Sequence, residues 1–250
     1  MSLRVTYFGH ATTLVEAAGT RIVTDPILRR AILGGFIRRA GAAPRLDRPD
    51  AVLLSHQHAD HLDLPSLRRL GRETPVIAPR GSGGRIGRGG MTNVREVEAG
   101  ETARIGDAVV TATPALHDGR RLPIGRPVDA LGYTISSPAG RVYFAGDTDL
   151  FDEMADLADI DVALLPIGGW GGNEMGEGHL DPERAARAAA LIRPRVVVPI
   201  HWGTLLRADL QRRRPALHEP PPAELRRHLA EHAPDVELRI LEPGDLLEIG

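Results

Sequence analysis

The sequence predicts an α/β protein built from short strands with helices packed against them. The segment Leu3–Thr24 contains three short strand patterns, and Asp181-Pro182 has the residues of a helix start. Early strands followed by later helices favour a sheet covered by helices. A length of 250 residues permits one large domain with a substantial core. Because no segment has the character of an interdomain linker, we expect residues 1–250 to form a single domain.

Strands are predicted where short apolar or alternating segments lie between turn-forming residues. In chain order they are Leu3–Phe8, Thr12–Glu16, Arg21–Thr24, Ala51–Leu54, Val76–Ala78, Val94–Val97, Thr102–Ile105, Asp107–Ala112, Leu131–Ser136, Arg141–Ala145, Val162–Pro166, Val196–Ile200, Val236–Leu241 and Leu246–Ile249. Helices are predicted to begin near Pro65, to cover Leu150–Leu157, to run from Asp181 to Ile192, and to cover Ala223–Glu231.

Two segments do not match a regular pattern. Ile27–Asp47 mixes apolar and basic residues around Gly34-Gly35, which interrupt a helix pattern. We interpret it as an ordinary surface insertion or a flap over a site, in preference to a lipid-facing surface. Gly81–Gly90 contains six glycines, but it lacks the phosphate-binding G-x-x-x-x-G-K-[ST] pattern. A flexible loop is the expectation for this second segment.

The composition excludes several classes of function. The chain has no cysteine, which excludes disulfides, thiol catalysis and zinc sites made of cysteine. All 31 basic residues are arginine, and the formal net charge of −2 provides no general attraction for nucleic acid. No signal-peptide pattern is visible, and no apolar run approaches the ~18 residues of a membrane span. We expect a cytoplasmic protein without a nucleic-acid partner or stable membrane insertion, and leave assembly as a homo-oligomer open.

The segment Ser55–His61 concentrates the chemistry of the chain. After Ser55 it reads H-x-H-x-D-H, in a loop between a predicted strand and a predicted helix. Alternate residues of an extended segment point the same way, so His56 and His58 present two imidazoles to one point. Asp60 and His61 present a carboxylate and an imidazole to a second point. Because imidazole and carboxylate are ligands of zinc and similar ions, the motif predicts a metal site.

Three further residues follow predicted strands, namely His117, Asp147 and His201. Each alone is a weak signal, because isolated histidines and Gly-Asp turns are common. Together with the motif they supply ligands for two divalent ions. Asp147 would bridge the ions, because a carboxylate has two oxygens. The predicted ligand sets are His56, His58 and His117 for one ion, and Asp60, His61 and His201 for the other.

The motif, followed in order by a histidine, Gly-Asp and a histidine, resembles the metallo-β-lactamase-fold hydrolase superfamily. The similarity runs from Phe8 to Trp202. It implies a four-layer αββα sandwich, with two sheets face to face, helices outside and the metals at one edge. A subgroup that includes L-ascorbate-6-phosphate lactonases and N-acyl-phosphatidylethanolamine-hydrolysing phospholipases D is similar in Phe8–Thr12, Thr24–Pro26, His179–Glu183 and Pro199–Trp202.

The resemblance implies a metal-dependent hydrolase with a small-molecule substrate. Two divalent ions, zinc first and manganese or iron(II) as alternatives, would share a bridging water and lower its pKa. As a hypothesis, the resulting hydroxide attacks an ester, lactone or phosphodiester bond of a small substrate, an anionic one included. Asp147 would hold the two ions at a fixed spacing, and Asp60 would orient or deprotonate the water.

Other residues are candidates for the surroundings of this site. Asp25 is expected to orient a metal-bound histidine. His10 is expected to contact substrate or support the metals, with a buried structural role as the alternative. His179 is placed as a catalytic candidate that meets an anionic substrate near the helix start, or as part of the capping loop. Pocket or packing roles stay open for Trp170 and Trp202, and surface positions are expected for His218, His228 and His232.

Four other functions compete with this hypothesis. A lipid-cleaving phosphodiesterase of the phospholipase D type is one alternative. A flavodiiron-type oxygen reductase is disfavoured, because its motif has Glu where this chain has His58. A nuclease of the same superfamily is disfavoured by the absence of spare length and of excess basic charge. A non-catalytic metal-binding module is disfavoured by the complete ligand set.

Overall fold

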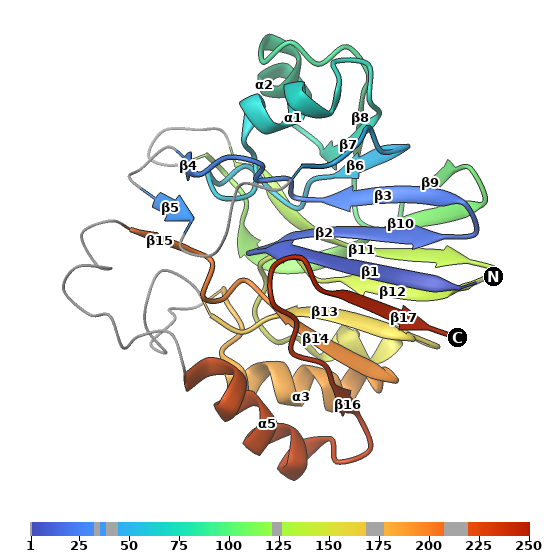
Figure 1. The fold of residues 1–250 in the computed structure, drawn as a ribbon, viewed down its shortest axis with the longest axis vertical. Coiled ribbons are helices and arrows are strands. Elements are labelled where there is room, and N and C mark those ends of the chain that lie inside the picture. The colour runs from blue at the N-terminus through green and yellow to red at the C-terminus, as the bar shows by residue number, and fades with distance from the viewer. Residues whose placement is uncertain (1, 33–35, 39–44, 122–126, 169–177, 208–219) are drawn as a thin grey trace.

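The computed structural model describes residues 2–32, 36–38, 45–121, 127–168, 178–207 and 220–250. Over these ranges two seven-stranded sheets lie face to face, and helices cover both outer faces (Figure 1). This architecture confirms the predicted four-layer sandwich. The described helices include none with the length and apolar character needed to cross a membrane.

The first sheet combines an antiparallel half with a parallel half. Its strand order is β17-β1-β2-β3-β6-β7-β8, antiparallel from β17 to β3 and parallel from β3 to β8. The strands are β1 (Leu3–Gly9), β2 (Thr12–Ala17), β3 (Thr20–Thr24), β6 (Ala51–Leu53), β7 (Val76–Pro79), β8 (Val94–Val97) and β17 (Leu246–Ile249).

The second sheet repeats this plan. Its order is β16-β14-β13-β12-β11-β10-β9, antiparallel from β9 to β12 and parallel from β12 to β16. The strands are β9 (Thr102–Ile105), β10 (Ala108–Asp118), β11 (Asp129–Ser137), β12 (Gly140–Phe144), β13 (Val162–Pro166), β14 (Val196–Ile200) and β16 (Glu237–Leu238). A separate small sheet joins β4 (Ala31–Ile32), β5 (Phe36–Arg38) and β15 (Leu205–Arg207).

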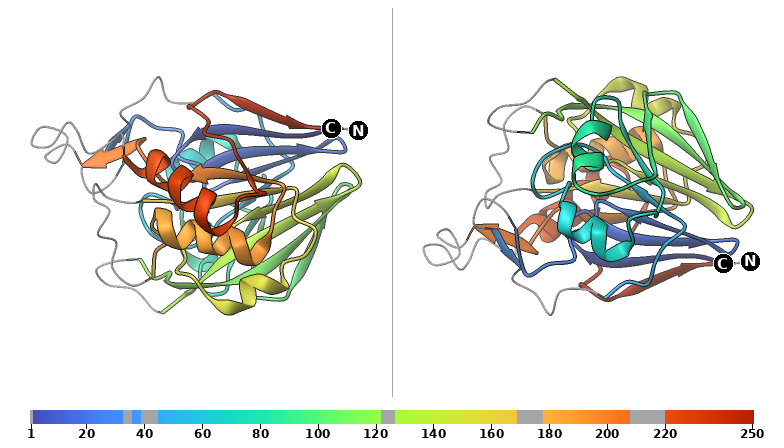
Figure 2. Two further views of the ribbon diagram at one scale, coloured as in Figure 1. Left: turned by 90° about the horizontal axis from the view of Figure 1, so that it is seen from below. Right: turned by 90° about the horizontal axis from the view of Figure 1, so that it is seen from above.

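The helices divide between the two outer faces, as Figure 2 shows from both sides. One face has α1 (Leu64–Leu70) and α2 (Gly83–Arg88), and the other has η1 (Asp152–Asp156), α3 (Pro182–Ile192) and α5 (Pro220–His232). The side chains of Asp63 and Asp181 accept hydrogen bonds from the free backbone N–H groups at the starts of α1 and α3. The predicted helix start at Asp181 is therefore confirmed.

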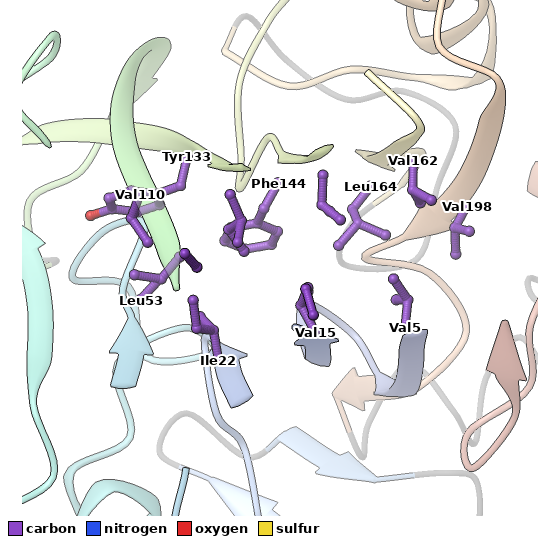
Figure 3. Packing of buried hydrophobic residues seen from close by; sticks show 14 of the residues in the cluster. Val5, Val15, Ile22, Leu53, Val110, Tyr133, Phe144, Val162, Leu164 and Val198 are labelled. Carbon is purple, nitrogen blue, oxygen red and sulfur yellow. The ribbon is translucent and has the colours of Figure 1, made fainter. Parts of the chain in front are cut away.

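The main core lies between the two sheets. Figure 3 shows Val5, Val15 and Ile22 of the first sheet facing Phe144 and Leu164 of the second, all of them buried. Two further apolar clusters lie outside the sheets, one under α1 and α2 and one under α3 and α5. Successive residues of a strand point to opposite faces of its sheet, so the same strands supply the inner and the outer clusters. The two sheets and the two helix layers are therefore held together as one structure.

The loop predicted at Gly81–Gly90 is wrong, because Gly83–Arg88 form α2. The side chain of Ile86 is fully buried in the cluster under the helices, and Glu96 accepts a hydrogen bond from the backbone N–H of Gly83. One buried apolar anchor and one capping carboxylate therefore outweigh the low helix propensity of glycine.

Several other boundaries differ from the predictions. Strand β10 extends beyond Ala112 to Asp118, because it resumes pairing with β11 after a register shift. The predicted helix over Leu150–Leu157 is one short 3₁₀ segment, and the last predicted strand before β17 shrinks to two residues. The described part of Ile27–Asp47 contributes β4 and β5 to the small sheet, and its remaining residues, 33–35 and 39–44, lie outside the described ranges.

Candidate metal centre

The predicted metal ligands meet at the edge where parallel strands end. His10 follows β1, the histidine motif follows β6, Asp147 comes soon after β12, and His201 follows β14. His117 lies near the end of β10, which is parallel to β12. This edge is opposite to the two chain termini (Figure 1). Both sheets therefore supply ligands to one place.

The first cluster consists of His56, His58 and His117, with their ligand atoms within 4.8 Å of one another. The Nδ1 atom of His117 donates a hydrogen bond to the carbonyl of Gly178 at 2.8 Å, which leaves its Nε2 atom with a free lone pair. That Nε2 atom lies 3.2 Å from Nδ1 of His58. The Nε2 atom of His56 is buried and has no hydrogen-bond partner.

The second cluster consists of Asp60, His61 and His201, with His10 beside them. The Nδ1 atom of His61 donates to the carboxylate of Asp25 at 2.6 Å, and Nδ1 of His201 donates to the carbonyl of Gly168. The two Nε2 atoms of these histidines therefore face each other as lone pairs, 3.1 Å apart. Two facing lone pairs repel, unless a proton or a metal ion lies between them.

Asp147 lies between the two clusters. Its Oδ2 atom is 3.2 Å from Nε2 of His61, 3.3 Å from Nε2 of His201 and 3.9 Å from Nε2 of His56. Its Oδ1 atom is buried without a hydrogen-bond partner. One carboxylate therefore faces both histidine clusters, as a bridging ligand must.

Burial and charge shift the pKa values of these groups in opposite directions. Burial opposes ionisation of Asp60 and Asp147, but the surrounding histidines hold the pKa of both carboxyls well below the usual range. Burial also opposes protonation of His61, yet the carboxylates of Asp147, Asp60 and Asp25 raise its pKa well above 6.5. In contrast, burial lowers the pKa of His58 to about 4, aided by the neighbouring His117.

The donor set fits divalent metal ions. Buried atoms without a hydrogen-bond partner include Nε2 of His56 and the Oδ1 atoms of Asp60 and Asp147. Buried polar atoms are rarely left unpaired, so these atoms fit the role of ligands to a cation. Imidazole nitrogens and carboxylate oxygens suit zinc, and also manganese or iron(II). The histidines whose Nδ1 atoms donate elsewhere already have the tautomer that a metal requires at Nε2.

The residues expected around the site are also brought together. The carboxylate of Asp25 accepts hydrogen bonds from His61 and from the backbone and hydroxyl of Ser55. His10 donates through Nε2 to Asp60 at 2.9 Å, and its ring lies 3.9 Å from that of His201. The side chains of Asp25 and His10 are both buried, so neither is positioned to meet substrate directly.

His179 precedes the N-cap Asp181 of α3 by two residues, beside the helix start as expected, and its ring faces the metal centre. Its Nε2 atom lies 3.7 Å from Oδ2 of Asp147, and its ring packs edge-on against His117 with 4.5 Å between centroids. Its side chain is 21 % exposed, whereas Asp147 is 2 % exposed. The imidazole of His179 is therefore partly exposed to solvent at the rim of the metal centre.

The remaining aromatic and histidine predictions have mixed outcomes. Trp202 is half-buried, donates to the carbonyl of Pro199 and packs against the cluster under α3. This is the packing role left open for it. His228 and His232 are half-buried on α5. Trp170 and His218 lie outside the described residues.

Sequence reasoning missed several partners of the metal ligands. The hydroxyl of Ser55 donates to Asp25 and accepts from Nδ1 of His56 at 2.9 Å. Its place directly before the motif was an available signal. The carbonyls of Gly168 and Gly178 orient His201 and His117, but no sequence pattern marks a backbone carbonyl as an acceptor.

Three residues of the centre have left-handed backbone conformations that non-glycine residues rarely adopt. The φ angles are 57° at His10, 31° at Asp25 and 59° at His201. Such conformations cost about 1–3 kcal/mol each and persist where the surrounding contacts impose them. Strain at several residues of one site is typical of a functional centre.

Comparison with known proteins agrees with this geometry. The Beta-lactamase superfamily domain matches residues 20–202. A UPF0173 metal-dependent hydrolase of Methanopyrus kandleri is 35% identical over 98% of this chain and 100% of its own length. A second one, from Nitratidesulfovibrio vulgaris, is 34% identical over 100% of this chain and 96% of its own.

Among solved structures, a metallo hydrolase from the hyperthermophilic archaeon Ignicoccus hospitalis has a TM-score of 0.72. It is 26% identical and the comparison covers 100% of this chain and 99% of that one. The fold, the sequence similarity and the clustered histidines and carboxylates all indicate the same family. The chain therefore belongs to the metallo-β-lactamase superfamily as a metal-dependent hydrolase of the UPF0173 family.

Proposed function

We propose that the protein is a dinuclear hydrolase that cleaves an ester, lactone or phosphodiester bond of a small substrate. One ion is assigned to His56, His58 and His117, the other to Asp60, His61 and His201, and Asp147 to both. The observation behind this assignment is the convergence of imidazole lone pairs, 3.1 Å apart at His61 and His201, on the carboxylate of Asp147. Zinc is the ion we expect.

Two ions are favoured over one because the assigned ligands form two adjacent groups. The His56, His58, His117 group and the His10, Asp60, His61, His201 group share no residue, while the ligand atoms of His56 and His61 also lie within 4.8 Å of each other and of Asp25. When bound, two divalent ions lower the pKa of a shared water, supply hydroxide near neutral pH and stabilise the charge that develops on the oxygen under attack.

The protein itself orients the reacting groups. His10 holds one oxygen of Asp60 by a hydrogen bond, which leaves Oδ1 free to bind the metal or to accept a proton from water. Asp25 and Ser55 fix the ring orientations of His61 and His56. Because these contacts exist before substrate binds, the geometry requires little reorganisation during the reaction.

Substrate access is proposed from the side of the partly exposed imidazoles. His58, His117 and His179 are half-buried, whereas His56, His61 and His201 are buried. The first group forms the rim and the second forms the floor. We assign His179 as the side chain that contacts the substrate, since it is partly exposed and lies beside Asp147. Burial lowers the pKa of His179 to about 4, so near neutral pH its imidazole is neutral and can accept a proton or a hydrogen bond.

The test is elemental analysis of protein purified without chelator, with activity assays on the same sample. The assay panel contains a small ester, a lactone, a phosphate-bearing lactone, a soluble phosphodiester and a phospholipid. About two metal ions per chain and turnover that a chelator abolishes would support the proposal. The best substrate then distinguishes a lactonase-like enzyme from a phospholipase D-like one.

A matched variant separates hydrolysis at this centre from contaminating activity. His179→Gln should lose most turnover. The metal count of the same variant decides whether His179 acts on the substrate or binds metal, because its ligand atom lies within 4.8 Å of those of His117 and Asp147. Two metals with no turnover on any substrate class would favour a non-catalytic binding module. One metal per chain at saturation would contradict the dinuclear assignment.

A further inference from the structure

The last turns of α5 contain a second group of potential metal ligands. Glu231 follows His228 by three positions and His232 follows it by four. All three residues therefore lie on one side of the helix. Their ligand atoms lie within 4.8 Å of one another. Two histidines at positions i and i+4 of a helix are a spacing that binds zinc in other proteins.

The two imidazole rings are arranged as a pair. Their planes are 10° from parallel and their centroids are 6.3 Å apart. Glu231 is exposed, and the two histidines are half-buried, so all three remain reachable from solvent. Rotation of two exposed side-chain bonds would bring both imidazoles to one ion without movement of the backbone.

The state of His228 indicates an unsatisfied site. Its Nδ1 atom is buried and has no hydrogen-bond partner. Its Nε2 atom lies 3.3 Å from a guanidinium nitrogen of Arg227, which donates to it. Whichever nitrogen binds a metal, this contact is lost, because Nε2 then either gives its lone pair to the metal or carries the ring proton. Arg227 is therefore a competitor of the metal.

The helix end adds a favourable field. His232 is the last residue of the 13-residue helix α5, where the unpaired carbonyl groups give a partial negative charge. A cation bound there is stabilised by this charge and by the carboxylate of Glu231. The group shares no residue with the centre at the sheet edge, and α5 packs against α3 on the outside of the second sheet (Figure 2).

We propose that His228, Glu231 and His232 form a separate surface site for a transition-metal cation of the zinc, nickel or copper(II) class. Two imidazoles and one carboxylate select such ions over magnesium and calcium, which prefer all-oxygen ligands. Among the described residues, this site would add a third ion at metal saturation to the two proposed at the sheet edge. This inference does not depend on the hydrolase assignment.

The test uses untagged full-length protein on immobilised nickel. Because His58, His117 and His179 at the sheet edge are also partly exposed, the result is the difference in retention between wild type and the α5 variants. Wild-type protein should be retained, and His228→Gln and His232→Gln should each elute at a lower imidazole concentration. Arg227→Gln should be retained more strongly, because the competing guanidinium is gone. Arg226→Gln, the adjacent exposed arginine, is the matched control and should behave as wild type.

Calorimetric titration with zinc then gives affinity and stoichiometry. The His228→Gln/His232→Gln double variant should lose one binding event and keep those of the sheet edge, with unchanged circular dichroism. Magnesium should produce no corresponding event. Equal retention of wild type and double variant, or an unchanged number of zinc events, would overturn the proposal. Weaker retention of Arg227→Gln would also contradict it, since removal of a positive charge cannot weaken a cation site.

Discussion

At the scale of single residues, four of the assigned histidines, His56, His61, His117 and His201, have a neighbour that holds their Nδ1 atom. Asp25 binds His61 and, through Ser55, also controls His56. The backbone carbonyls of Gly168 and Gly178 accept hydrogen bonds from the Nδ1 atoms of His201 and His117 in the same way. The orientation of these four imidazoles is thus set by atoms outside the metal site, which makes the outer partners testable.

Asp147→Asn should strongly reduce activity. The amide keeps the size of the side chain but removes the negative charge that faces both clusters. The charge stabilisation supplied by a two-metal site is worth several kcal/mol, so we expect kcat to fall by roughly 100-fold or more. Activity and metal content would be measured together. Asp152→Asn, an exposed carboxylate on η1, is the control, and wild-type metal content and activity in Asp147→Asn would refute the bridging role.

Asp25→Asn should weaken metal binding without direct contact to the metal. The amide can no longer serve both Ser55 and His61 as a charged acceptor, so the ring of His61 loses its orientation. Loss of such an outer partner typically costs about 10–100-fold in metal affinity. Competition with a chromophoric chelator measures the metal affinity of the variant and of wild type. An affinity equal to that of wild type would show that the contact has no part in metal binding.

Metal affinity should rise with pH across the neutral range. Burial opposes protonation of His61 and His201, but Asp147 and Asp60 raise the pKa of both, so protons compete with metal at these nitrogens more strongly than at an ordinary histidine. A bound metal must displace these protons, and each one released increases the affinity about tenfold per pH unit below its pKa. Zinc affinity measured at pH 6, 7 and 8 gives the slope of the logarithm of affinity against pH. A flat profile would contradict the raised pKa values.

At the scale of elements, two loops from different sheets are joined around the centre. The backbone N–H of Gln57 donates to the carbonyl of Gly119 at 2.9 Å. One guanidinium nitrogen of Arg121 donates to the carbonyls of Gln57 and Leu62, at 3.0 and 3.1 Å. Arg121 therefore spans the histidine loop and holds it against the end of β10, where His117 lies.

Arg121→Gln should loosen the histidine loop. The shorter side chain cannot reach both carbonyls, so we expect the affinity for at least one metal ion to fall by about tenfold. Chelator competition would measure the affinity, and thermal unfolding of the metal-free variant would test for a general loss of stability. Arg120→Gln is the control, because Arg120 is exposed and pairs with Asp118. Equal affinities in both variants would refute the function of Arg121 as a clamp.

At the scale of the whole molecule, the metal centre joins the two sheets. The first sheet supplies the histidine loop after β6, and the second supplies His117, Asp147 and His201. The inter-sheet core continues to this edge through Leu53, which is buried in the same cluster as Phe144. Metal binding therefore connects the halves of the sandwich at the end opposite to the chain termini.

Removal of the metals should lower the melting temperature. A ligand at 100 times its Kd stabilises the folded state by about 2.7 kcal/mol. For a chain of this size, each kcal/mol corresponds to about 2–4 °C, so chelation should lower the melting temperature by about 5–10 °C. Differential scanning calorimetry before and after chelation, with zinc added back, measures this. No change on chelation would show that the centre does not connect the sheets energetically.

Local patterns were sufficient for most of the fold. The strands near Leu3–Phe8 and Val162–Pro166 and the helix after Asp181 were predicted, because alternation and caps are local signals. Helix α2 was missed because its stability comes from the buried side chain of Ile86, a contact that glycine-rich sequence does not reveal. The extension of β10 was missed because pairing with β11 across a register shift is not local.

The sequence by itself determined the superfamily, the order of most strands and the potential of the motif to bind metal, since these depend on residue types at fixed spacings. Only the tertiary structure decided that His179 lies beside Asp147, that Asp25 reaches His56 through Ser55, and which carbonyls orient the rings. The physical reason is that hydrogen bonds are directional and short, so they depend on the packing of distant segments to within fractions of an ångström.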